Sequence, residues 1–177
     1  ATEVPLVADI HFDYRLALAA ISAGVHKLRI NPGNIGSESR VAELARAAKN
    51  RGVPIRIGVN AGSLPRSLVD TYGPTSRAMV EAALWHVGLL EKAGFDQIVV
   101  SMKASEVART VEAYVMLAEK VRYPLHVGVT EAGPPPGGLV KSAVGIGIIL
   151  GHGIGDTIRV SLTGDPVAEV RAGHDIL

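Results

Sequence analysis

Six short apolar runs, each followed by a segment with helical periodicity, constrain the fold of this chain more than any other feature. We expect strands at residues 5–12, 27–31, 54–60, 97–103, 124–129 and 157–162. We expect helices at residues 14–23, 38–51, 76–93, 105–122, 140–151 and from Pro166 to the end of the chain. Strands that alternate with helices pair in parallel and are joined by right-handed crossovers. The sequence therefore predicts an α/β fold with a parallel sheet.

Local signals add detail to this pattern. Residues 32–36 are rich in glycine and predict a turn, whereas residues 61–75 predict an irregular segment that includes an extra short helix. Gly145 and Gly147 lie inside a predicted helix although glycine disfavours helices, so we expect close packing at both. Trp85 is expected to pack against neighbouring elements.

Every predicted strand ends in polar or charged residues. These ends carry Asp9 with His11, Arg29 with Asn31, Arg56 with Asn60, Ser101 with Lys103, Thr130 with Glu131, and Arg159 with Ser161. In an open doubly wound sheet the ligand groups gather near one switch point, so most strands need no polar end. Polar ends on all six strands instead predict a common centre, as in a (β/α) TIM-barrel type fold with parallel strands.

A barrel of this type has eight strand–helix units and about 250 residues. The chain has 177 residues, does not begin with Met and enters a strand almost at once. We therefore expect six of the eight units here, with the first two absent, and a single partial barrel domain over residues 1–177.

The charges expected at the mouth of the barrel indicate an anionic ligand. The cations are Arg29, Arg56, Lys103, Lys141 and Arg159, and the anions are Asp9 and Glu131. Cations gathered in one cleft repel one another unless a multiply charged anion joins them, and arginine chelates phosphate oxygens well. After residue 131 a glycine–proline loop opens a helix, and helix N-termini attract anions. A phosphorylated or diphosphorylated small molecule is the predicted ligand.

Composition excludes several other classes of function. Lys and Arg (18) nearly balance Asp and Glu (17), and aromatic residues make up 4% of the chain, which argues against nucleic acid as a partner. No apolar stretch approaches the roughly 20 residues of a membrane span, so we expect no membrane and a cytoplasmic protein. Without cysteine the chain has no thiolate metal site, and no metal site is predicted within it.

Some of these residues also have plainer interpretations. His11 and His126 could bind a metal, but hydrogen-bonded structural histidines are favoured because no carboxylate-rich ligand set surrounds them. Lys103 could form a Schiff base, although contact with phosphate is preferred. Glu131 acts either as an acid or base or as the ion-pair partner of an arginine. The asparagines at strand ends and the glycine–proline loop are also compatible with ordinary turns.

Seven segments resemble the 4-hydroxy-3-methylbut-2-enyl diphosphate synthase family, in register from end to end. They are ADIHFD at 8–13, LRINPGNI at 28–35, IRIGVNAGSL at 55–64, VSMKAS at 100–105, GVTEAG at 128–133, VKSAVGIG at 140–147 and GIGDTIRVSLTGDP at 153–166. The resemblance implies the third to eighth units of a barrel that binds 2-C-methyl-D-erythritol 2,4-cyclodiphosphate. It also implies an oxidoreductase of the non-mevalonate isoprenoid route, which opens this ring by reductive dehydroxylation.

The resemblance further implies roles for individual residues. Glu131 would be catalytic, as the proton donor to the departing hydroxyl. The substrate-binding residues would be Asp9, His11, Arg29, Asn31, Arg56, Asn60, Ser101, Lys103, Thr130, Lys141, Arg159 and Ser161.

Parts of the family's machinery are absent from this chain. The 4Fe-4S cluster is held in a separate C-terminal domain by three cysteines and a glutamate, and this chain has no cysteine. We therefore expect the chain alone to be inactive within an active parent protein. That parent would be a homodimer that receives electrons from flavodoxin or ferredoxin.

Two rival functions remain on the residues alone. One is a barrel enzyme acting on a phosphorylated small molecule, either a lyase or aldolase with an imine at Lys103 or a transferase like dihydropteroate synthase. The other is a fragment that binds phosphate passively.

Overall fold

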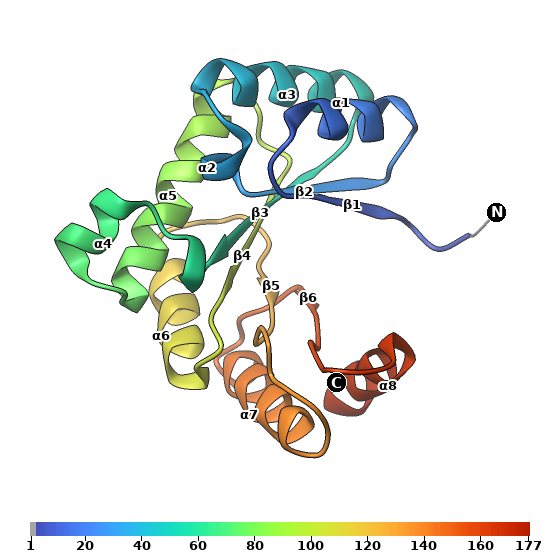
Figure 1. Cartoon of the computed structure of the whole chain (residues 1–177), viewed down its shortest axis with the longest axis vertical. Coiled ribbons are helices and arrows are strands. Elements are labelled where there is room, and N and C mark those ends of the chain that lie inside the picture. Colours follow the sequence, from blue (N-terminus) through green and yellow to red (C-terminus); the bar gives the residue numbers. More distant parts are fainter. Residues whose placement is uncertain (1–2) are drawn as a thin grey trace. The chain divides into compact units, whose positions relative to one another are not determined.

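The computed structural model describes residues 3–177. Its elements in chain order are β1 (Val7–Ile10), α1 (Tyr14–Ser22), β2 (Lys27–Ile30), α2 (Pro32–Ile35), α3 (Glu38–Arg51), β3 (Ile55–Asn60), the 3-10 helix η1 (Ala61–Ser63), α4 (Arg66–Tyr72), α5 (Ser76–Lys92), β4 (Ile98–Lys103), α6 (Val107–Ala118), β5 (His126–Val127), α7 (Gly137–Gly151), β6 (Thr157–Ile158) and α8 (Pro166–Ile176) (Figure 1). The chain forms two compact units. The first contains the residues up to Gly58 and Ala83–Val100, and the second contains Val59–Ala82 and Ser101–Leu177.

The first unit is built on a sheet with the strand order β1-β2-β3-β4. The pairs β1 with β2 and β2 with β3 are parallel, as predicted. Helices α1 and α3 lie side by side against this sheet (Figure 1). The side chains of Leu28, Ile30, Ile55 and Ile57 are fully buried. Leu28 pairs with Ile55 and Ile30 with Ile57 in register, so these four side chains pack on one face of the sheet, opposite the face that carries Arg29 and Arg56.

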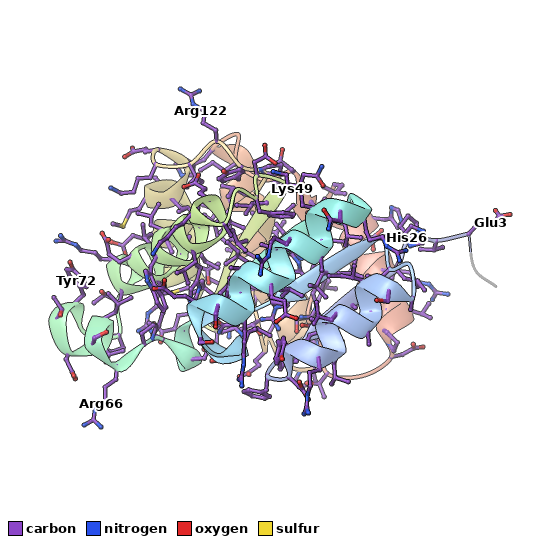
Figure 2. The ribbon with its side chains drawn as sticks, turned by 90° about the horizontal axis from the view of Figure 1, so that it is seen from above. Glu3, His26, Lys49, Arg66, Tyr72 and Arg122 are labelled. Atoms are coloured by element: carbon purple, nitrogen blue, oxygen red, sulfur yellow. The ribbon has the colours of Figure 1, made fainter. Side chains whose placement is uncertain are left out.

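Helix ends in the first unit are fixed by specific side chains. Asp13 accepts the backbone N–H of Arg15 at 2.9 Å at the start of α1. The Arg15 guanidinium also binds this carboxylate, and these hydrogen bonds lower the pKa of Asp13 to about 2. Gly52 ends α3 in the left-handed conformation at φ 64°. Lys49, labelled in Figure 2, donates from the last turn of α3 to the carbonyl of Gly94 at 2.8 Å.

The second unit contains the parallel pair β5 and β6 and the end of β4 from Ser101 to Lys103. Helix α6 contacts α7, and α7 contacts α8. The core of this unit includes Tyr114, Leu117 and Val127, which are fully buried. Within the described residues β5 pairs with β6 and not with β4, so the sheet is interrupted between β4 and β5.

The α/β alternation is confirmed, but the last two strands are shorter than predicted. The strand predicted at residues 124–129 is reduced to two residues in β5, and the one at 157–162 to two residues in β6. The carbonyl of His126 is taken by the hydroxyl of Tyr114, which interrupts strand pairing on that side. The prediction of α6 from residue 105 is also wrong, since α6 begins at Val107.

Proline accounts for two further corrections. The turn predicted at residues 32–36 is the short helix α2, because Pro32 stands at its first position and Asn31 caps it. Helix α7 begins at Gly137 rather than at residue 140, because the carbonyls of Pro134 and Pro136 already accept helical hydrogen bonds. The extra short helix expected within residues 61–75 is confirmed as α4.

Close packing is confirmed at one of the two helical glycines. A Cβ on Gly145 would lie 2.5 Å from a methyl group of Val129, whereas one on Gly147 would meet nothing within 4 Å. The side chain of Trp85 is 48% exposed, so it packs with only about half of its surface.

Within residues 3–177 no helix combines the length and the apolar character that crossing a bilayer would require.

Candidate functional site

In the first unit, three of the predicted site residues form a row across neighbouring strands. Asp9 on β1 is paired in register with Arg29 on β2, and Arg29 with Arg56 on β3. Residues in register on adjacent strands point to the same face of a sheet. The register therefore directs the side chains of Asp9, Arg29 and Arg56 to one face of the sheet.

Arg29 is the buried centre of this row. Its Nη1 donates to Asp9 Oδ1 at 2.7 Å, and the side chains are 8% and 49% exposed respectively. A Cβ on Gly58 would overlap the Arg29 guanidinium. The guanidinium therefore packs directly against the backbone of Gly58. This close approach explains why a glycine stands in the middle of a buried strand.

His11 and Asn31 lie at the ends of the same strands. His11 Nε2 is 3.5 Å from Asp9 Oδ1 and 3.5 Å from Arg29 Nη1, so His11 joins this cluster. The Asn31 side chain accepts the N–H of Gly33 at 3.2 Å, so this residue has the capping role of an ordinary turn asparagine.

The unequal exposure of Asp9 and Arg29 leads to a prediction about stability. Asp9→Ala leaves a buried guanidinium without this carboxylate and is expected to lower the free energy of unfolding by about 1.5–3 kcal/mol. Arg29→Met is expected to cost less, because the half-exposed Asp9 carboxylate can be rehydrated. Urea unfolding of both variants measures the difference. A larger loss for Arg29→Met would contradict this account of the pair.

In the second unit, four predicted residues line one pocket of about 390 Å³. They are Asn60, Lys103, Thr130 and Glu131, and the pocket is completed by residues 61–63, 104 and 105. Lys103 is 5% exposed, so this cationic residue is buried where it lines the pocket. A buried cation beside hydroxyl, amide and carboxylate groups suits a small anionic ligand that also carries hydroxyl groups.

Glu131 has an uncommon backbone conformation at this pocket. Its φ is 51°, the one positive φ of a non-glycine residue among residues 3–177. The neighbouring backbone fixes it, since Thr130 N–H donates to Ala104 O and Ala132 N–H to Ser161 O, both at 3.2 Å. Left-handed backbone at a residue with a side chain costs about 1–3 kcal/mol and is concentrated at functional sites.

A second glycine lies next to Lys103 and to the chain that follows β6. A Cβ on Gly128 would lie 3.5 Å from Lys103 Nζ and would collide with the backbone oxygen of Arg159. Gly128 therefore permits the close approach of the chain that continues β6, whereas the 3.5 Å to Lys103 Nζ is an ordinary contact distance.

The other predicted residues of the second unit lie outside this pocket. Arg159 Nη2 donates to Ser161 Oγ at 3.4 Å, and Arg159 borders a different pocket of about 300 Å³ with His174 and Leu177. Ser101 is buried on the same strand as Lys103, and Lys141 is half-buried on α7. The structure thus brings four of the predicted residues of this unit together and leaves four elsewhere.

The two histidines weighed as metal ligands take part in hydrogen-bond clusters instead. His126 Nδ1 lies 2.8 Å from Thr157 Oγ1, and His11 belongs to the Asp9 cluster. In the described part of the chain no three His, Asp or Glu side chains are grouped so that they could hold a metal ion.

Several residues that shape these sites were not singled out from the sequence. Gly58 and Gly128 were readable in principle, since glycine inside a strand signals close approach. Ser105 was expected to begin a helix but lines the pocket. Nothing in the local sequence indicates which distant side chain approaches each of these positions.

A protein-family model described as the GcpE TIM-barrel domain matches residues 1–174. The chain is 63% identical over 175 residues to a curated 4-hydroxy-3-methylbut-2-en-1-yl diphosphate synthase (flavodoxin) of Symbiobacterium thermophilum, covering 98% of this chain and 47% of that protein. The protein of the same name from Geobacter sulfurreducens is 60% identical, covering 98% of this chain and 50% of its own length. The chain therefore spans about half the length of these relatives.

Solved structures show the same fold at low identity. A dihydropteroate synthase of Xanthomonas albilineans superposes with a TM-score of 0.61 at 15% identity, covering 97% of this chain and 63% of that one. A type I 3-dehydroquinate dehydratase of Clostridium difficile gives 0.58 at 11% identity, covering 88% and 60%. These likenesses show the fold alone.

Proposed function

This chain belongs to the GcpE TIM-barrel domain family, and from that premise we propose that it is the substrate-binding barrel segment of a 4-hydroxy-3-methylbut-2-en-1-yl diphosphate synthase. The proposed substrate is 2-C-methyl-D-erythritol 2,4-cyclodiphosphate. The parent protein opens its ring by two-electron reductive dehydroxylation in the non-mevalonate route to isoprenoids, and the isolated chain does not turn it over. The observation that carries this proposal is the pocket in which a buried Lys103 lies beside Thr130 and Glu131.

The chemistry of the pocket suits that substrate. The Lys103 ammonium binds phosphate oxygens, and its burial strengthens the attraction because little water competes there. Asn60 and Thr130 offer neutral hydrogen-bonding groups to the hydroxyls of the carbon skeleton. Arg29, Asn31, Arg56, Arg159 and Ser161 remain predicted ligands of the diphosphate, and Asp9, His11, Ser101 and Lys141 remain predicted substrate-binding residues.

Glu131 has the proposed role of proton donor to the departing hydroxyl. Its side chain lines the pocket, and its left-handed backbone is held on both sides by hydrogen bonds to neighbouring segments. A general acid must be held within reach of the oxygen that leaves, and a fixed backbone serves that purpose.

An iron–sulfur cluster does not fit the residues of this chain. The cluster needs thiolate ligands, and the sequence contains no cysteine. In our proposal the parent holds a 4Fe-4S cluster with residues outside this chain, which supplies the two electrons of the reduction. Flavodoxin or ferredoxin delivers these electrons, and the parent is a cytoplasmic homodimer.

The proposal predicts a large loss of ligand binding when the Lys103 charge is removed. Calorimetric titration of the full-length protein with the cyclic diphosphate should show Lys103→Met weakening binding by about 1.5–3 kcal/mol, roughly 10- to 150-fold. Lys120→Met, which removes an exposed lysine just after α6, is the matched control and should bind normally. Equal affinities for Lys103→Met and wild type would refute the assigned site.

A carbonyl substrate would make a different use of Lys103, whose burial also suits imine formation. Borohydride treatment in the presence of a phosphosugar would then leave a covalent adduct on this lysine. An unmodified Lys103 in the peptide mass spectrum removes the aldolase alternative.

A further inference from the structure

The interruption of the sheet between β4 and β5 is filled by one side chain. Tyr114 projects from α6 and is fully buried. Its hydroxyl accepts the backbone N–H of Met102 at 3.0 Å and donates to the backbone carbonyl of His126 at 2.5 Å. Met102 lies on β4 and His126 on β5, so the hydroxyl replaces a direct hydrogen bond between the two strands.

After the Tyr114 bridge, the segment that follows β4 and the segment that follows β5 are joined by a direct hydrogen bond. Thr130 N–H donates to the carbonyl of Ala104 at 3.2 Å. Ala104 is also held by α6, because its N–H donates to Thr110 Oγ1 at 3.3 Å, one helical turn before Tyr114. The segments are therefore spaced by a hydroxyl at the level of Met102 and joined without one at the level of Ala104.

Lys103 lies between these two levels. It is the residue between Met102 and Ala104, and its Nζ is directed towards Gly128, two residues after His126. The pocket it lines also contains Thr130 and Glu131 from the far end of the same segment. The spacing between the segment 102–104 and the segment 126–130 therefore affects the distance between the Lys103 ammonium and Glu131.

We infer that the Tyr114 hydroxyl is a positioning group for the ligand pocket and acts through Lys103. This inference rests on the proposed function, because it assigns Tyr114 to the pocket in which that function is placed. Tyr114 does not line the pocket, so it does not touch the ligand. Thr110 also helps to position Lys103, because its hydroxyl binds the backbone N–H of Ala104 directly after β4.

The test is Tyr114→Phe in the full-length protein, with the affinity for the cyclic diphosphate measured by calorimetry. We expect the affinity to fall by roughly 10-fold, which is part of the roughly 10- to 150-fold loss expected when the Lys103 charge is removed altogether. The matched control is Ser76→Ala. Ser76 is also buried and its hydroxyl also bonds to α6, at the carbonyl of Arg109 (3.1 Å) and at Glu112 (2.7 Å), away from both strands.

Combining each substitution with Lys103→Met separates positioning from general weakening. If Tyr114 acts through Lys103, Tyr114→Phe should cause little further loss in the Lys103→Met background, whereas independent effects would multiply. Thr110→Val should show the same dependence and serves as the second variant if Tyr114→Phe does not fold.

The outcomes distinguish this inference from the proposed function. Equal losses for Tyr114→Phe and Ser76→Ala, or losses that multiply with Lys103→Met, would overturn the positioning role while leaving the Lys103 site intact. Normal binding by Lys103→Met alone would overturn both.

Discussion

Gly128→Ala is expected to lower the free energy of unfolding by about 3 kcal/mol, at the upper end of the cost of overpacking a core. The added Cβ would collide with the backbone oxygen of Arg159. A backbone atom cannot rotate away as a side chain can, and the Arg159 N–H is bonded to Val127 O at 2.9 Å. Accommodation therefore requires β5 and β6 to separate, with loss of their pairing. Urea unfolding followed by circular dichroism measures the change.

The control for this substitution is Gly147→Ala, which adds the same methyl group to α7 in the same unit. Its Cβ would meet nothing within 4 Å. Alanine is favoured over glycine in a helix by about 1 kcal/mol, so this variant should be more stable than wild type. Destabilisation of similar size in both variants would show that the close approach at Gly128 is not the cause.

We expect the free energy of unfolding of the first unit to fall at acidic pH, because His86 is buried in its neutral form. This side chain is 2% exposed, and burial lowers its pKa from 6.5 to about 4. The native state therefore keeps the ring neutral while the unfolded state takes up a proton below pH 6.5. Stability should be unaffected by His86 above pH 6.5 and should fall as the pH drops towards 4, by about 3 kcal/mol at 1.36 kcal/mol per pKa unit.

His86→Leu isolates this contribution. Neither ring nitrogen of His86 has a hydrogen-bond partner within the described residues, so leucine removes two unpaired polar atoms along with the titration. Urea unfolding between pH 4 and pH 7.5 should show a shallower pH dependence for His86→Leu and no loss of stability at pH 7.5. Parallel curves for the variant and wild type would contradict the assignment to His86.

Strands and helices of the first unit were predictable because their signals are local. Buried runs such as 54–60 and the periodicity of 38–51 recur in the structure as β3 and α3 with nearly the same bounds. Asp9 and Arg29 were both expected at strand ends, and they pair in register on one face of the sheet. The bounds of strands and helices are predictable because each residue of an element repeats the same backbone geometry.

The shortened strands and the grouping within the pocket were not predictable in the same way. β5 does not pair with β4, because Tyr114, from a different element, takes the carbonyl of His126. Arg159 was expected beside Lys103, but the chain after β6 directs it to a different pocket. Such outcomes depend on which distant side chains meet, and spacing along the sequence carries no information about that.

The half-exposed indole of Trp85 gives the first unit an optical reporter. It is the chain's single tryptophan, and its ring centroid is 5.0 Å from that of His86. Excitation of the indole therefore samples the surroundings of one point on α5, and an imidazolium formed beside it would quench the emission. Intrinsic fluorescence of the chain follows the opening of this unit without any attached dye.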